Sequence, residues 1–131
     1  RIRSRCVGQF QQDEPNAAPP WDTVEAAYDR IAKRFNAHRR YPWEFVLEWL
    51  QSAPEEEKEL VVAGCGAGRH VEAAVEVGHH HSIKAVDISQ GMLNTARSRL
   101  GDDVSDRVQL IQSSVCNLPF KAESHDAVMA C

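Results

Sequence analysis

The chain of 131 residues contains no long apolar run, so we expect no transmembrane helix. Its N-terminus carries Arg1, Arg3 and Arg5 without an apolar core or small-residue cleavage site. This argues against a signal peptide and leaves a transit-peptide remnant as the weaker alternative. The 4 cysteines show no metal-type spacing, which favours a reducing intracellular setting, the cytoplasm first and an organelle second. A net charge of -4 excludes a general attraction to nucleic acid, so such binding would need a local patch.

What is present suits one globular domain, with 43% hydrophobic and 26% charged residues. Residues 1–20 are polar and read as a tail or extended arm. Residues 21–53 hold two predicted helices. The first runs from Trp21 or Asp22 to Ala37, and the second follows Pro42. Their apolar residues recur at helical spacing: Val24, Tyr28, Ile31 and Phe35 in the first, and Trp43, Val46, Leu47 and Leu50 in the second.

Residues 54–131 alternate between apolar runs and helical patterns. We predict strands at 60–63, 83–88, 108–112 and 126–130, and helices at 69–77 and 90–100. Ser89 is the expected cap of the second helix, and Gly78 and Gly101 are the expected helix ends. This order predicts an α/β fold with a parallel sheet covered by helices on both faces. The last strand would leave an unpaired apolar edge, so we expect either a longer protein or another chain that covers it.

A glycine loop follows the first strand, with Gly64, Gly66 and Gly68 just before a helix. Glycines are needed where a backbone turns sharply against a ligand, and helix N-termini present unpaired N–H groups. Asp87, at the end of the next strand, is placed to accept hydrogen bonds from a ribose. The segment therefore predicts a nucleoside-type cofactor site. Arg69 stands where a dinucleotide fingerprint has its third glycine, which makes a dehydrogenase the weakest alternative.

Three motifs in order resemble those of class I S-adenosylmethionine-dependent methyltransferases: the Gly-x-Gly-x-Gly loop, the segment 85–93, and Leu118-Pro119-Phe120 followed by residues 124–128. The resemblance implies a Rossmann-like methyltransferase fold, of which the chain would hold the first half, and S-adenosylmethionine as cofactor. It implies that Asp87 holds the ribose and that Ile88 stacks on adenine. The implied cofactor-binding residues after the first strand are Gly64, Cys65, Gly66, Gly68, Asp87, Ile88, Met92, Ser114 and Val115.

The upstream segment 28–35, with Arg39, Pro42 and Trp43, resembles the tRNA wobble-uridine carboxymethyl methyltransferases. That family methylates a carboxylate on tRNA with a small zinc-binding partner protein. The resemblance implies that the N-terminal helices form a lid over the cofactor. Tyr28, Arg39 and Trp43 would lie near its methionine end, with Arg39 paired to the carboxylate. A carboxylate acceptor is ionised at neutral pH and needs no general base, so no catalytic residue is assigned.

Two positions depart from the family pattern. Val62 and Ser114 stand where methyltransferases usually carry acids that help to hold the cofactor. These departures favour an alternative in which the chain is a catalytically inactive methyltransferase-fold protein, serving as a structural or RNA-assembly subunit. The intact glycine loop and Asp87 favour the enzyme.

Other clusters have a plain interpretation beside a functional one. One basic cluster could bind along tRNA phosphates or could be a solvated helix end. This cluster consists of Lys33, Arg34, His38, Arg39 and Arg40. The run 79–81 is histidine throughout and predicts an exposed loop rather than a metal site. The acidic run 55–57 is expected to face water. Cys65 and Cys116 are expected to be small buried residues rather than nucleophiles.

Overall fold

The computed structural model describes residues 20–38 and 41–130. Its elements in chain order are α1 (Pro20–His38), α2 (Glu44–Gln51), β1 (Glu59–Ala63), α3 (Arg69–Val77), β2 (Ser82–Asp87), α4 (Gln90–Leu100), β3 (Val108–Gln112) and β4 (Ala127–Ala130). The short 3-10 helix η1 (Asp102–Val104) lies between α4 and β3 and is not predicted by the sequence pattern. The predicted helices and strands are otherwise confirmed, and α3, α4 and β3 have the predicted bounds.

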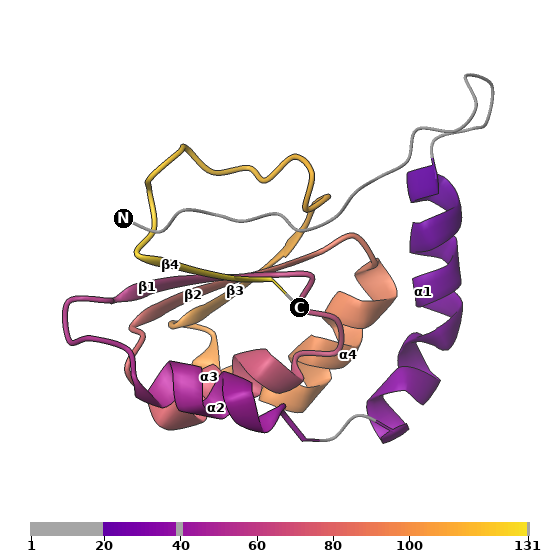
Figure 1. Cartoon of the computed structure of the whole chain (residues 1–131). Coiled ribbons are helices and arrows are strands. Elements are labelled where there is room, and N and C mark those ends of the chain that lie inside the picture. The colour runs from indigo at the N-terminus through magenta and orange to yellow at the C-terminus, as the bar shows by residue number, and fades with distance from the viewer. Residues whose placement is uncertain (1–19, 39–40, 131) are drawn as a thin grey trace.

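The strands form one parallel sheet in the order β3-β2-β1-β4. Helices α2, α3 and α4 lie on one face, while the segment between β3 and β4 passes over the other (Figure 1). Helix α1 stands at the side, next to α4. This is the Rossmann-like methyltransferase arrangement expected from the sequence. The expected helices on both faces are not found in the described residues, because the connection from β3 to β4 over the second face contains no helix (Figure 1).

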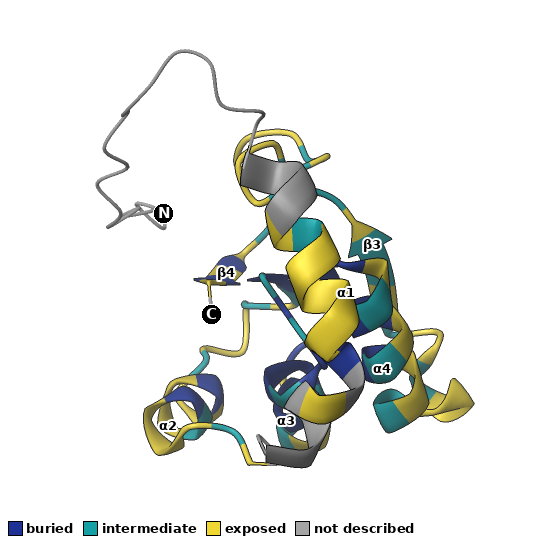
Figure 2. Ribbon diagram, turned by 90° about the vertical axis from the view of Figure 1, so that its right-hand side faces the viewer, coloured by how far each residue is buried: buried dark blue, intermediate teal, exposed yellow. Residues whose placement is uncertain are grey.

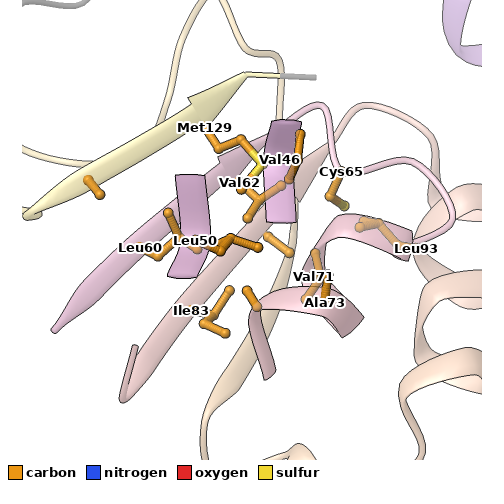
Figure 3. Packing of buried hydrophobic residues seen from close by; sticks show 13 residues of the cluster. Val46, Leu50, Leu60, Val62, Cys65, Val71, Ala73, Ile83, Leu93 and Met129 are labelled. Atoms are coloured by element: carbon orange, nitrogen blue, oxygen red, sulfur yellow. The ribbon is translucent and has the colours of Figure 1, made fainter. Parts of the chain in front are cut away.

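The core lies between the sheet and the helices on that face (Figure 3). Leu50 of α2, Leu60 of β1 and Ile83 of β2 are each 0% exposed. Val62 is equally buried and is aligned with Ala85 on one side and Met129 on the other. A carboxylate at this position would have to be desolvated among apolar groups. The valine therefore contributes to core packing.

The apolar stripe of α1 is less buried than its helical pattern suggests. Val24, Tyr28 and Ile31 keep 40%, 41% and 42% of their surface exposed, and Figure 2 shows much of this helix as exposed. The contact with α4 is made instead through Ala32, which is 2% exposed, and Asp29. Helix α1 meets the first turn of α4 through the N–H of Gly91 and the buried side chain of Met92, and the rest of its apolar stripe remains partly exposed.

Three expectations about exposure are wrong. His80 is 0% exposed, because the loop folds back and its Nε2 lies 2.7 Å from Oε1 of Glu57. Glu57 is correspondingly half-buried rather than fully water-facing. Cys116 is exposed, since the segment after β3 makes its turn at the surface, whereas Cys65 is buried as predicted.

Among the described residues, no group of three or more potential metal ligands is gathered at one place, and no helix is long and apolar enough to cross a membrane.

Candidate cofactor site

The glycine loop connects β1 to α3 at the carboxyl end of the sheet. Because β2 and β4 flank β1 on opposite sides, the loop lies where the strand order reverses, the usual ligand position in open parallel sheets. Gly64, Gly66 and Gly68 have φ angles of 72°, 53° and 87°, which side chains rarely adopt. A Cβ added at Gly66 would meet no atom within 4 Å, so bare backbone faces open space there.

The loop's own N–H groups are mostly engaged within the protein. Those of Gly64 and Cys65 donate to the carbonyl of Val86 at 2.8 and 2.9 Å. The N–H of Gly66 donates to Oδ2 of Asp87 at 2.8 Å, and that of Gly68 donates to the carbonyl of Cys65 at 3.0 Å. A phosphate-binding loop needs such donors turned towards its anion. This loop is therefore suited to a cofactor without a pyrophosphate.

Asp87 is held at the end of β2 by two backbone donors. Besides the bond from Gly66, its Oδ1 accepts from the N–H of Ser89 at 2.9 Å. The residue is 8% exposed, so the orientation of the carboxylate is fixed by the chain around it. A carboxylate has about four acceptor positions, and these two bonds leave capacity for a pair of hydroxyl groups.

Helix α1 reaches this site through residues that the sequence pattern does not single out. Oδ1 of Asp29 accepts from the hydroxyl of Ser89 and, at 2.8 Å, from the N–H of Gly91. About one turn earlier in the helix, Glu25 accepts from Nε2 of Gln112 at 3.0 Å, and the same amide donates to the carbonyl of Ile88 at 3.1 Å. The only sequence feature that points to this contact is the expected cap residue Ser89, followed two residues later by Gly91.

Trp43 lies against the start of α3, directly after the glycine loop. Its ring centroid is 4.4 Å from the guanidinium carbon of Arg69 and 5.1 Å from the ring centroid of His70. The backbone N–H of Trp43 donates to Nε2 of His70 at 3.4 Å. Burial lowers the pKa of His70 to about 4, with Arg69 and Arg99 adding to the effect. A neutral imidazole is what this acceptor role requires.

The remaining predicted site residues are distributed around the same edge. Ser113 donates its N–H to the carbonyl of Asp87 at 3.0 Å, which brings the following Ser114 and Val115 to the end of β2. Val115 is 53% exposed, and the hydroxyl of Ser114 accepts from the N–H of Cys116 at 3.2 Å.

Two further predicted residues have less direct positions. Met92 is 0% exposed and packs with Ala32 and Ala67, between α1 and the glycine loop, so its immediate role is packing. Tyr28 lies on α1 beside Asp29 and is 41% exposed. Arg39 is outside the described residues.

Comparisons with known proteins agree with this geometry. A family described as "Methyltransferase domain" matches residues 60–131. The demethylmenaquinone methyltransferase of Clavibacter sepedonicus is 32% identical over 108 residues, covering 82% of this chain and 42% of the relative. The chain thus spans less than half the length of that curated relative.

Solved structures share the fold. A methyltransferase from Haloferax volcanii, solved with the Trm112 methyltransferase activator, superposes with a TM-score of 0.68 at 24% identity, covering 82% of this chain and 46% of that one. An S-adenosylmethionine-dependent methyltransferase from Methanococcus maripaludis gives 0.59 at 23%, covering 90% and 53%. The [4+2]-cyclase SpnF gives 0.64 at 20%, covering 85% and 48%.

The glycine loop, the Asp87 carboxylate at the end of β2 and the family match agree with one another, and S-adenosylmethionine is the cofactor of this class. The chain belongs to the methyltransferase-domain family.

Proposed function

We propose that this chain forms the cofactor-binding part of an S-adenosylmethionine-dependent methyltransferase. The observation that carries the proposal is the Asp87 carboxylate, held by the N–H groups of Gly66 and Ser89 beside a glycine loop that uses its own donors internally. Asp87 would accept from the two ribose hydroxyls, and the bare backbone at Gly66 would lie against the cofactor. Ile88, Ser114 and Val115 would surround the adenine.

The protein's contribution to such a reaction is mainly positioning. The cofactor, when bound, supplies an activated methyl group. The chain's residues would fix its ribose and present its methyl end towards the segment around Trp43. Residues 21–53 would act as a lid over this end, with Tyr28, Arg39 and Trp43 close to the methionine part. The cofactor-binding unit would span 54–131. The predicted arm at 1–20 falls outside the described residues, except for Pro20, the first residue of α1.

For the acceptor, we propose a carboxylate on the wobble uridine of tRNA. The motif at 28–35, together with Arg39 and Trp43, supports this choice, and the basic cluster around residue 34 would follow phosphates. The Haloferax volcanii neighbour was solved with a methyltransferase activator, which supports a small activator protein as a partner here. The relative from Clavibacter sepedonicus favours a second acceptor class, a demethylmenaquinone-type quinone ring.

Thermal unfolding with and without S-adenosylmethionine tests the cofactor. At a hundredfold excess over the dissociation constant, binding should stabilise the folded chain by about 2.7 kcal/mol. Asp87→Ala and Asp87→Asn should each remove most of this shift, whereas Asp103→Ala, an exposed acid on η1, should keep it. No shift of the unaltered chain at millimolar cofactor would contradict the proposal.

Transfer of a labelled methyl group then separates the acceptors. Label in tRNA that carries the carboxymethyl group, given the activator protein, supports the first acceptor, and label in a demethylated quinone supports the second. Cofactor binding without transfer to either would favour the inactive, structural alternative. The [4+2]-cyclase among the structural neighbours illustrates that this fold is not confined to methyl transfer.

A further inference from the structure

Helix α1 contacts the methyltransferase core at a point adjacent to the ribose-side carboxylate. A continuous set of hydrogen bonds runs from α1 to the glycine loop: Asp29 to the Ser89 hydroxyl, the Ser89 N–H to Asp87, and Asp87 to the Gly66 N–H. Ser89 is 0% exposed and its hydroxyl also accepts from the N–H of Met92 at 3.0 Å. The residue is thus fixed on both sides, between α1 and Asp87.

Packing runs parallel to these bonds. Ala32 of α1, Ala67 of the glycine loop and Met92 of α4 form a separate small buried cluster, with Met92 0% exposed. A displacement of α1 would therefore uncover the side chain of Met92, which also packs against Ala67 of the glycine loop. Two independent sets of contacts, one polar and one apolar, join the same helix to the same loop.

The approach of α1 depends on a glycine. A Cβ at Gly91 would lie 3.0 Å from Oδ1 of Asp29, 3.2 Å from its Cα and 3.3 Å from Cβ of Ala32. Two of these three neighbours are not the ends of flexible side chains, so the helix itself would have to move. Gly91 lies in the first turn of α4 without a positive φ, so its need for glycine comes from this contact.

We infer that Asp29 is a positioning residue, which couples the docking of α1 to the orientation of Asp87 and hence to cofactor affinity. The inference rests on the proposed cofactor role of Asp87. Donation from Ser89 and Gly91 lowers the pKa of Asp29, so this acceptor is charged at neutral pH. In this arrangement the cofactor stabilises the docked helix, and the docked helix stabilises the bound cofactor, by the same factor.

The first test compares S-adenosylmethionine dissociation constants for the full chain and its variants by calorimetry. Asp29→Ala should weaken binding by at least about fivefold, at the low end of common coupling factors. Asp29→Asn, which keeps Oδ1 as an acceptor, should recover most of the affinity. Gly91→Ala should also weaken binding although alanine is the better helix former, and Asp103→Ala should not. A purely structural role would lower the unfolding midpoint while leaving the affinity of the folded chain unchanged.

The second test needs no cofactor and so separates this inference from the proposed function. Amide hydrogen exchange at Gly66 and Ser89 should be faster in Asp29→Ala and Gly91→Ala than in the unaltered chain and in Asp103→Ala. If exchange at Gly66 is the same in all four proteins, the coupling is overturned, whatever the cofactor result. If exchange changes as expected and the unaltered chain binds no S-adenosylmethionine, the coupling stands and the proposed function fails.

Discussion

At the scale of single residues, the imidazole of His70 is buried in its neutral form. It is 3% exposed, and its Nε2 is needed as an acceptor for the N–H of Trp43. Its folded pKa of about 4 lies below the ordinary value of 6.5 because of burial and two nearby arginines. Between these two values the unfolded chain binds a proton that the folded chain does not. Stability should therefore fall as the pH drops through this interval.

A glutamine at this position can still accept a hydrogen bond but cannot titrate. We expect His70→Gln to flatten the dependence of the unfolding free energy on pH between about 6.5 and 4, removing a slope of up to about 1.4 kcal/mol per pH unit. Urea unfolding at several pH values measures this slope. His79→Gln, at an exposed neighbour, should leave it unchanged. Equal slopes for His70→Gln and the unaltered chain would disprove the assignment.

At the scale of elements, the third loop glycine sets how closely the start of α3 approaches α4. A Cβ at Gly68 would lie 3.0 Å from Cβ and 3.3 Å from Cα of Ala96. Its φ of 87° resembles that of Gly78, which is 78°, but an added Cβ at Gly78 would meet only ordinary contacts at 3.9 and 4.0 Å. The two positions share their backbone strain and differ in crowding.

Gly68→Ala and Gly78→Ala should each lose about 1–2 kcal/mol from the left-handed backbone. Gly68→Ala should lose a further 1–3 kcal/mol or so, because it overpacks the contact with α4. Denaturant unfolding of both variants measures the difference. A cycle that includes Ala96→Gly should show that the extra loss is relieved in the double variant. Equal losses at the two glycines would count against the crowding.

Much of this element structure could be predicted from local chemistry. The cap at Ser89, the helix end at Gly78 and the spacing of the loop glycines all act within a few residues of themselves. The role of Asp29 could not be predicted, because its partners Ser89 and Gly91 lie far along the chain. His80 shows the same limit, since its burial depends on Glu57 in a different loop.

At the scale of the whole molecule, β4 is paired only with β1 in the described part of the chain. A groove of about 560 Å³ lies beside this strand, with aromatic side chains of α2 and of the preceding segment along one wall. Its lining is Trp43, Phe45, Val46, Trp49, Glu57, Val128, Met129 and Ala130. Phe45 is 65% exposed and Val128 is 42% exposed. An apolar edge of this kind is open to pairing with a further strand, either of a longer protein or of another chain.

We expect this chain to associate with itself at high concentration, and we expect Val128→Lys to reduce that association by placing a charge beside the edge. Sedimentation velocity over a range of concentrations measures the effect. Val24→Lys is a matched control, since Val24 is similarly exposed, at 40%, but lies on α1. An equal reduction in both variants would show that net charge, rather than the edge, governs association.

The parallel strand order also has a consequence for how the chain folds. Leu60 is aligned with Ile83 on one side and with Ala127 on the other, so the second pairing closes a much longer loop. Each doubling of loop length adds only about 0.6 kcal/mol of closure entropy, yet distant pairings slow the search. We expect β1 and β2 to nucleate first and β4 to join last. The paired strands β1 and β2 would then form the template onto which β4 docks, on the opposite side of β1 from β2.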